Sequence, residues 1–146
     1  MILLENRKAR HEYEILKTYT AGMVLTGAEV KSLRAKKGSL TGSYAKIING
    51  EVYLLNVQIN PYEFADNSEY DPKRTRKLLL QKKEISQIAA YQEQKNYTLV
   101  PLKIKLEGNY LKAEIGVGRG LKKHQKREKL KQRAQERDAA REMKFR

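Results

Sequence analysis

Apolar and polar residues alternate along much of the first 118 positions, which is the pattern of β-strands with one buried face. Five segments share it: 11–18, 44–48, 51–57, 99–106 and 110–117. Asn49 and Gly50 separate the second segment from the third, and both residue types tolerate the positive φ angles of a tight hairpin turn. Gly108 and Asn109 separate the last two segments. We therefore expect short antiparallel strands joined by at least two hairpins.

Two further segments fit helices. Thr26 is a suitable N-cap for a helix that would run through a basic stretch and end at Gly38. A second helix is expected from about Lys82 to Gln94, with its isoleucines on one face. The leucine run 78–80 fits either a buried strand or the first turn of that helix, and its periodicity leaves both open.

Many short strands with few helices predict a mainly β body over residues 1–118, closed or nearly closed into a small antiparallel barrel. Closure would also remove exposed strand edges. Lys103, Lys105 and Lys112 alternate with apolar neighbours, so we expect one basic face on the sheet. Pro101 lies early in its strand, which favours an edge or a bulge because proline has no N–H to donate.

Residues 119–146 differ from the body in charge and in apolar content. They hold twelve basic and four acidic residues, which is a net +8 of the formal +14. Their large apolar residues are Leu121, Leu130, Met143 and Phe145. Because ordering one residue costs about 1–2 kcal/mol, so few apolar side chains cannot hold the segment folded. We expect a tail that is disordered when free and takes shape on a polyanionic partner.

The charge of the whole chain narrows the classes of partner. A net charge of +14 and a sequence pI near 9.9 indicate nucleic acid first, then anionic membrane, then acidic protein. No apolar stretch approaches the about 20 residues of a membrane span, and the apolar start is too short for a signal peptide. The chain has no cysteine, which excludes disulfides and thiolate metal sites. We expect a cytoplasmic protein that does not enter the membrane.

Residues suited to catalysis are sparse. The two histidines, His11 and His124, fall in a predicted strand and in the tail, with no third ligand for zinc. Asp66, Glu69 and Asp71 could suggest a metal cluster, but acidic residues around a proline are typical of turns. No glycine-rich phosphate loop and no nucleophile elbow occurs. We expect no enzymatic activity, no metal site and no cofactor.

Basic residues of the body cluster in three places. The clusters are Arg7, Lys8 and Arg10; Lys31, Arg34, Lys36 and Lys37; and Lys73, Arg74, Arg76 and Lys77. One such run is often only a solvated surface, but three on a small body favour RNA, because arginine forks onto phosphates and lysine supplies a compact charge. Tyr62 and Tyr70 lie in predicted loops and are candidates for stacking on unpaired bases, with a structural role as the alternative.

Four sequence blocks, taken together and in order, resemble one known family. They are N-R-K-A-R-H-E-Y at 6–13, G-A-E-V-K-S-L-R at 27–34, D-P-K-R-T-R-K-L-L-L at 71–80, and the region 120–128. The chain is similar to the SsrA-binding protein (small protein B) family, the partner of tmRNA in bacterial trans-translation. The resemblance covers nearly the whole chain, and the second and third blocks are specific as a pair.

The resemblance implies an oligonucleotide-binding-type barrel with two or three short helices and a basic C-terminal tail. It implies that the body binds the tRNA-like domain of tmRNA. With elongation factor Tu, the complex would reach a ribosome stalled without a usable codon. There the tail would enter the vacant mRNA channel at the decoding centre of the small subunit and fold into a helix. We expect a monomer.

The resemblance also implies roles for individual residues. Asn6 and the 78–80 run match positions associated with tmRNA contact, and we take Leu80 as the contact within the run. Basic residues are expected to add contacts to the RNA backbone: Arg7, Lys8, Lys73, Arg74, Arg76 and Lys77. The tail residues that match the motif for the decoding centre are Gly120, Lys122, His124, Lys126 and Arg127.

Three positions depart from the family pattern. Thr20 stands where glutamate is usual, Leu121 replaces a lysine and Gln125 replaces an aspartate, so none of the three receives a role. The main hypothesis is a non-catalytic RNA-binding factor for ribosome rescue. The alternative is a structural ribosomal protein with a basic extension that binds rRNA. A small RNA-processing enzyme is third and would need a catalytic cluster.

Overall fold

The computed structural model describes residues 1–94, 96–121, 131, 133–135 and 137. The strands of the body are β1 (Ile2–Glu5), β2 (Tyr13–Met23), β3 (Gly38–Ser39), β4 (Tyr44–Ile48), β5 (Glu51–Leu55), β6 (Gln58–Ile59), β7 (Arg76–Leu79), β8 (Tyr97–Glu107) and β9 (Tyr110–Gly120). The helices of the body are α1 (Arg7–Glu12), α2 (Gly27–Arg34) and α3 (Lys82–Gln92).

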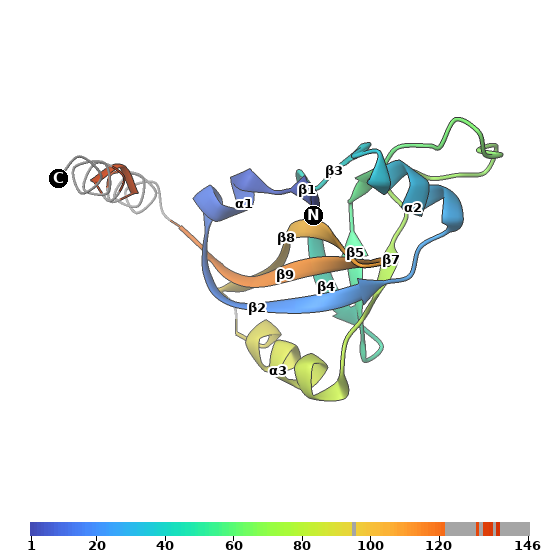
Figure 1. Ribbon diagram of the computed structural model, residues 1–146. Helices are drawn as coiled ribbons and strands as arrows, with labels where there is room; N and C mark the ends of the chain where they lie inside the picture. Colours follow the sequence, from blue (N-terminus) through green and yellow to red (C-terminus); the bar gives the residue numbers. More distant parts are fainter. Residues whose placement is uncertain (95, 122–130, 132, 136, 138–146) are drawn as a thin grey trace.

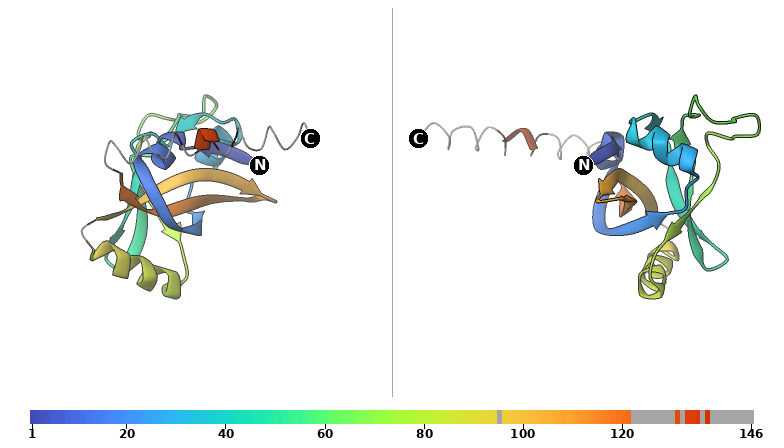
Figure 2. Two further views of the ribbon diagram at one scale, coloured as in Figure 1. Left: turned by 90° about the vertical axis from the view of Figure 1, so that its left-hand side faces the viewer. Right: turned by 45° about the vertical axis from the view of Figure 1, so that its right-hand side comes forward.

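The larger sheet is antiparallel and closes on itself. Its strand order is β1-β8-β4-β5-β7-β2-β9, and β9 also pairs with β8. The strands β8, β4, β5, β7, β2 and β9 therefore form a closed ring. Outside this ring, β1 pairs with residues 103–105 of β8. Figures 1 and 2 show this ring with α3 at one end and with α1 and α2 toward the other. The predicted mainly β antiparallel barrel is confirmed.

Both predicted hairpins are present. β4 and β5 join at Asn49 and Gly50, whose φ angles are 51° and 78°. β8 and β9 join at Gly108, which has a φ angle of 59°. Pro101 lies where the register of β8 on β9 shifts, so of the two predicted positions it takes the bulge. Pro101 itself pairs with Ile115, and Leu102 is the residue left outside the ladder before pairing resumes at Lys103.

The interior of the ring is apolar, and β2 and β9 approach each other closely at one glycine. A Cβ atom at Gly118 would lie 2.9 Å from the Cβ of Tyr13, so the absent side chain lets β2 cross β9 closely. Burying one large apolar side chain stabilises the fold by about 1.5–3 kcal/mol. The largest fully buried apolar residues are Leu33, Leu54, Ile59, Leu78, Ile88, Leu102, Ile104 and Ile115.

The N-terminal basic segment forms a helix that the alternation did not predict. Residues 11 and 12 belong to α1 rather than to a strand, and β2 begins at Tyr13. Asn6 caps α1, because its side chain accepts a hydrogen bond from the Ala9 backbone N–H at 3.2 Å. With only Ala9 buried, this short helix shows no apolar periodicity in the sequence.

The predicted helix that begins after Thr26 is present but shorter than expected. Thr26 and Glu29 form a capping box, in which each side chain accepts from the other residue's backbone N–H. α2 ends at Arg34 because Lys36 takes a left-handed φ of 59°, while Gly38 belongs to β3. None of the helices in the described residues is long and apolar enough to cross a membrane.

Strand pairing fixes two boundaries that the sequence left open or misplaced: the start of α3 and the end of the folded body. The leucine run 78–80 begins in strand β7, which pairs with β2 and β5, and α3 starts only at Lys82. Arg119 and Gly120, which we assigned to the tail, lie in β9 and pair with Glu14 and Tyr13 of β2. The folded body therefore extends two residues beyond the predicted boundary at 118.

Candidate nucleic-acid interface

Basic residues around α2 and β7 divide into an inward set and an outward set. The inward set surrounds the carboxylate of Glu29, which is 1% exposed on the inner face of α2. Arg76 donates from Nε to this carboxylate at 2.7 Å, and its Nη2 lies 2.6 Å from the same oxygen. Arg74 donates from Nε at 3.1 Å and forms a second ion pair with the other oxygen. One buried carboxylate thus neutralises two arginines.

Arg76 is fully buried, and its side chain has no free donor. Beyond the carboxylate of Glu29, its guanidinium donates to the Val57 carbonyl at 2.7 Å, the Arg74 and Pro72 carbonyls at 3.0 Å, and the Tyr70 hydroxyl at 3.1 Å. The prediction that Arg76 contacts RNA phosphates is therefore wrong. Alternation along β7 explains the direction, because Arg76 and Leu78 point inward on the same face.

The electrostatics of this network favour the charged carboxylate. Burial raises the pKa of Glu29, but hydrogen bonds from Arg74, the Thr26 backbone and Arg76 outweigh it and lower the pKa from 4.5 to about 2. Burial and the nearby carboxylate raise the pKa of Tyr70. The Tyr70 hydroxyl lies 2.8 Å from the Ile59 carbonyl, so this tyrosine takes the structural alternative rather than stacking on RNA.

The other residues of the 73–77 cluster are only partly available. Arg74 is two-thirds buried and bound to Glu29, while Lys77 lies 3.8 Å from the Glu51 carboxylate. Lys73 is exposed, and within the described part of the chain its side chain has no ion-pair partner. Of the four predicted backbone contacts here, Lys73 is the accessible one.

Outward-facing cations lie instead along and just after α2. Lys31, Arg34, Lys36 and Lys37 are all exposed, and among the described residues no carboxylate pairs with them. The lysines of the sheet differ: Lys103 pairs with Glu114 at 3.3 Å, and Lys105 and Lys112 pair with Glu107 at 3.0 and 3.9 Å. The sheet face expected to be basic is therefore largely neutralised, whereas α2 and the turn after it hold four exposed cations without a carboxylate partner among the described residues.

An exposed apolar surface adjoins α2. Leu79 is 53% exposed and Tyr110 is 73% exposed, although Leu78 is buried and Leu80 packs partly against the core. A groove of about 230 Å³ runs beside them, lined by Gly22, Met23, Leu25, Val30, Leu79, Asn109, Tyr110, Leu111 and Lys112. Leu79 is therefore the most exposed leucine of the 78–80 run, while Leu80, the predicted contact, is partly buried. The alternation within β7 was the signal for it.

Asn6 lines a cleft between α1, β8 and the start of β4. It is 7% exposed, and its side-chain N–H₂ donates to the Pro101 carbonyl at 3.0 Å and the Leu40 carbonyl at 3.4 Å. Asn6 therefore fixes α1 against β8 and the 40–43 turn, instead of presenting a free amide. Arg7 and Lys8 beside it are exposed.

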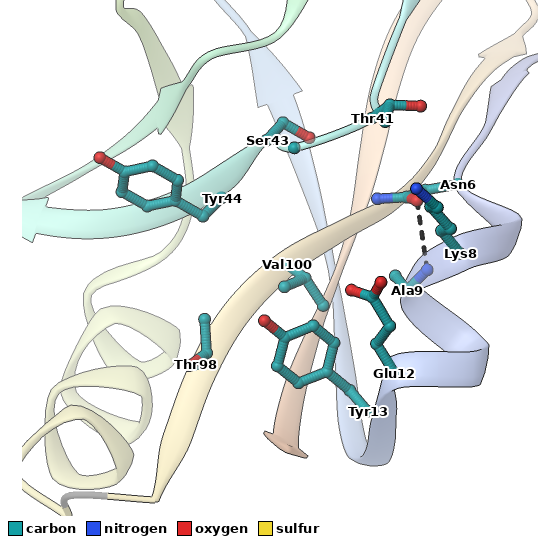
Figure 3. A pocket seen from close by; sticks show the side chains of 11 residues that line it. Asn6, Lys8, Ala9, Glu12, Tyr13, Thr41, Ser43, Tyr44, Thr98 and Val100 are labelled. Atoms are coloured by element: carbon teal, nitrogen blue, oxygen red, sulfur yellow. Dashed lines mark hydrogen bonds between the residues drawn. The ribbon is translucent and has the colours of Figure 1, made fainter. Parts of the chain in front are cut away.

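The cleft itself has a volume of about 360 Å³ and lies between α1, β8 and the start of β4 (Figure 3). Its lining residues are Asn6, Lys8, Ala9, Glu12, Tyr13, Thr41, Gly42, Ser43, Tyr44, Thr98 and Val100. Five of these residues carry a hydroxyl group, and Lys8 and Glu12 of α1 bring opposite charges to the same wall. Because Glu12 repels phosphate, this cleft suits ribose hydroxyls or base amino groups better than a run of phosphates.

The start of the tail is tied to the barrel. Gly120 pairs with Tyr13, and the Leu121 N–H donates to the Glu12 carbonyl at 2.9 Å. Lys122, His124, Lys126 and Arg127, the predicted residues for the decoding centre, lie outside the described residues. Farther along, residues 131, 133–135 and 137 are helical.

Comparison with known proteins gives the family. A model of the family described as SmpB protein matches residues 3–145. The chain belongs to the SmpB protein family. SmpB relatives named SsrA-binding protein are 55% identical over 98% of this chain in Microcystis aeruginosa and 46% identical over 96% in Anoxybacillus flavithermus. This chain covers 94% and 91% of those two proteins.

A solved SmpB structure has the same fold. It is described as "tmRNA-SmpB: a journey to the center of the bacterial ribosome", and its chain is 48% identical to this one. The two superpose with a TM-score of 0.70 over 88% of this chain and 94% of that chain. Together with the closed ring of strands, this confirms a small barrel of oligonucleotide-binding type.

Proposed function

We propose that this protein binds the tRNA-like domain of tmRNA and delivers it to stalled ribosomes for trans-translation. Family membership supports the proposal, since relatives named SsrA-binding protein align over nearly the whole chain and a similar chain is described with tmRNA and the bacterial ribosome. The observation that carries it on the molecule is an exposed apolar surface, Leu79 and Tyr110, beside the unpaired cations of α2.

These two features bind RNA in complementary ways. Leu79 and Tyr110 offer an apolar and an aromatic surface on which the faces of unstacked bases and sugars can pack. Lys31, Arg34 and Lys37 offer positive charge to phosphates and release counterions when they bind. Lys73, Arg7 and Lys8 are further exposed cations that could contact the RNA backbone. No step of this function requires bond making or breaking by the protein.

The tail carries the second half of the proposal. Residues 121–146 enter the vacant mRNA channel of the small subunit and become helical there, with Gly120 at the tail's base. Lys122, His124, Lys126 and Arg127 engage the decoding centre. The protein acts as a cytoplasmic monomer and reaches the ribosome together with elongation factor Tu.

Salt dependence tests the body. If binding of the tRNA-like domain neutralises about six phosphates, the logarithm of the association constant should fall with log salt at a slope of roughly −4 to −5. Leu79→Asp should abolish the specific part of this binding, since it places a carboxylate against RNA. An affinity that ignores salt, or a Leu79→Asp variant that binds like the wild type, would contradict the proposal.

Truncation tests the division of labour. A chain that stops after Leu121 keeps every strand of the barrel, so it should still bind tmRNA and should fail to tag nascent chains on stalled ribosomes. Loss of both activities in a variant that still unfolds cooperatively would overturn the division. RNA crosslinked to the protein in cells should be dominated by tmRNA, and uniform rRNA reads would favour the alternative of a structural ribosomal protein.

A further inference from the structure

The connection between β6 and β7 carries the most exposed aromatic side chain of the described residues. Phe64 is 79% exposed, and its ring packs edge to face on Tyr62 with centroids 5.5 Å apart and an interplanar angle of 67°. Lys31 of α2 holds its Nζ 5.8 Å from the centroid of the Tyr62 ring. One exposed ring is ordinary on a protein surface, but this ring lies against a second ring and beside a cation, which together offer a surface for a partner. We call Tyr62, Phe64, Lys31 and Arg34 the aromatic platform.

The platform borders a groove with an apolar floor and cationic walls. The groove has a volume of about 620 Å³ and is lined by Gly27, Val30, Lys31, Arg34, Ala35 and Tyr62. Among the described residues, Lys31 and Arg34 form no ion pair that would reduce their attraction for a phosphate. Glu63 is exposed and follows Tyr62 in the sequence, so its negative charge adds to the connection and we expect a phosphate on the α2 side and a base on the Phe64 side.

The platform is held in place by the buried network described above. Glu29, on the inner face of α2, accepts hydrogen bonds from Arg74 and Arg76, which anchor the far end of the β6–β7 connection. At the near end, Asn67 donates to the Tyr62 carbonyl at 2.8 Å and fixes the turn that presents the rings. α2 and the connection therefore keep one relative arrangement, so binding needs little further ordering.

This groove is continuous with the proposed tmRNA surface. Val30 lines both this groove and the one beside Leu79 and Tyr110, so α2 separates two halves of one surface. A nucleic acid strand alternates a flat apolar base with a phosphate, which matches an aromatic ring with cations alongside. An acidic peptide would satisfy Lys31 and Arg34 but would leave Phe64 uncovered.

We propose that the aromatic platform binds an unpaired nucleotide of the tRNA-like domain, with its base stacked on Phe64 and its phosphate between Lys31 and Arg34. The inference rests on the proposed function and adds to it a stacking site at the β6–β7 connection. RNA that covers Leu79 and Tyr110 crosses α2 over Val30 to reach this site.

A unique fluorophore gives a direct test, because the chain contains no tryptophan. In Phe64→Trp, the indole should stack on the base, so its fluorescence should be quenched when the isolated tRNA-like domain is added. Gln92→Trp, at the end of α3 on the other end of the barrel, is the matched control and should show no quenching. Quenching by an acidic peptide or by ribosomal subunits, but not by the tRNA-like domain, would overturn the proposal.

Affinity measurements supply the second readout. Phe64→Ala should weaken binding of the tRNA-like domain about tenfold, and Phe64→Trp should retain wild-type affinity, since stacking on one aromatic ring has that magnitude. Lys31→Gln with Arg34→Gln should make the salt slope shallower by about 1.4–1.8. If the wild type binds the tRNA-like domain and Phe64→Ala binds it with the same affinity, the aromatic platform is overturned and the proposed function stands. If the wild type does not bind the tRNA-like domain at all, the proposed function is overturned together with the platform.

Discussion

Residues 71–77 and α2 are both rich in basic side chains, and they face each other across one carboxylate. In the first segment, Arg74 and Arg76 turn inward and converge on Glu29. In the second, Glu29 is the charged residue that is buried, and the cations of the same helix are exposed to solvent. One segment uses its charge to hold the fold, and the other keeps its charge available for a partner.

The contrast shows that local charge density does not predict which way the charge points. Alternation along β7 places Arg76 on the same side as Leu78, and helical periodicity places Glu29 opposite the exposed residues of α2. A buried arginine requires a carboxylate and carbonyl acceptors around it, and Arg76 has both. The inward pair also supports the outward set, because it fixes α2 against the β6–β7 connection.

The largest expected effect is on stability. Arg76→Met should lower the free energy of unfolding by about 3–5 kcal/mol, because it leaves the buried Glu29 carboxylate without its fully buried partner. Urea denaturation followed by circular dichroism measures it. Lys73→Met, three residues earlier and exposed, is the matched control and should change stability by no more than about 0.5 kcal/mol. Equal effects of the two variants would erase the distinction between inward and outward charge.

Acidification should remove the same contribution. The pKa of Glu29 is about 2 in the folded protein and 4.5 as its ordinary value, so its stabilisation is full above pH 4.5 and is lost as the pH falls toward 2. Arg74 and Arg76 face this carboxylate, together with the neutral Tyr70. Glu29→Gln should therefore be less stable than the wild type at pH 7, and the two should converge near pH 2.

The control for this titration is Glu63→Gln. Glu63 is exposed and forms no ion pair with any described residue, so this variant should follow the wild-type curve at every pH. Urea midpoints measured in steps between pH 7 and pH 2 would give both curves. A constant difference between wild type and Glu29→Gln across that range would mean that the pKa of Glu29 does not change on folding, which would contradict the stabilisation by Arg74 and Arg76.

Removing outward charge should affect RNA binding and leave the fold unchanged. Lys36→Gln with Lys37→Gln should weaken binding of the tRNA-like domain by about tenfold or more at 0.15 M salt, since each phosphate contact contributes a slope near 0.9. Stability should stay within about 0.5 kcal/mol of the wild type. Lys46→Gln in β4 with Lys83→Gln in α3 removes the same charge from exposed positions outside α2. If both pairs weaken binding equally, only net charge matters.

Much of the fold could be predicted because its signals are local. Alternation and the Asn49-Gly50 turn predicted the β4–β5 hairpin, and Thr26 as an N-cap predicted the start of α2. The closure of the ring depends on β2 pairing with β9, about a hundred residues later in the chain, and no local pattern specifies that pairing. α1 was missed because a six-residue helix with one buried residue has no measurable periodicity.

The candidate site was harder to predict than the fold. Composition identified the right class of partner, but Arg76, which was assigned to the surface, is buried, and Leu79 is more exposed than the predicted contact Leu80. Tyr62 and Tyr70 both lie in predicted loops and could not be told apart from the sequence. In the structure, Tyr62 packs against the exposed Phe64 ring, whereas the Tyr70 hydroxyl donates to the Ile59 carbonyl within the Glu29 network. Such assignments depend on which acceptors surround a side chain, and those acceptors come from distant parts of the chain.

The smallest effect is expected where cation and carboxylate are already paired on the sheet. Lys103→Gln should change the affinity for the tRNA-like domain by less than about twofold, because the Glu114 carboxylate at 3.3 Å already satisfies this lysine and cancels its field. Its cost should appear in unfolding instead, at up to about 1 kcal/mol for a pair of this exposure. Gel-shift titration and urea denaturation of the same variant separate the two. If Lys103→Gln reduced RNA affinity as much as Lys37→Gln does, RNA would also reach the sheet face, and α2 would not be the main outward cationic surface.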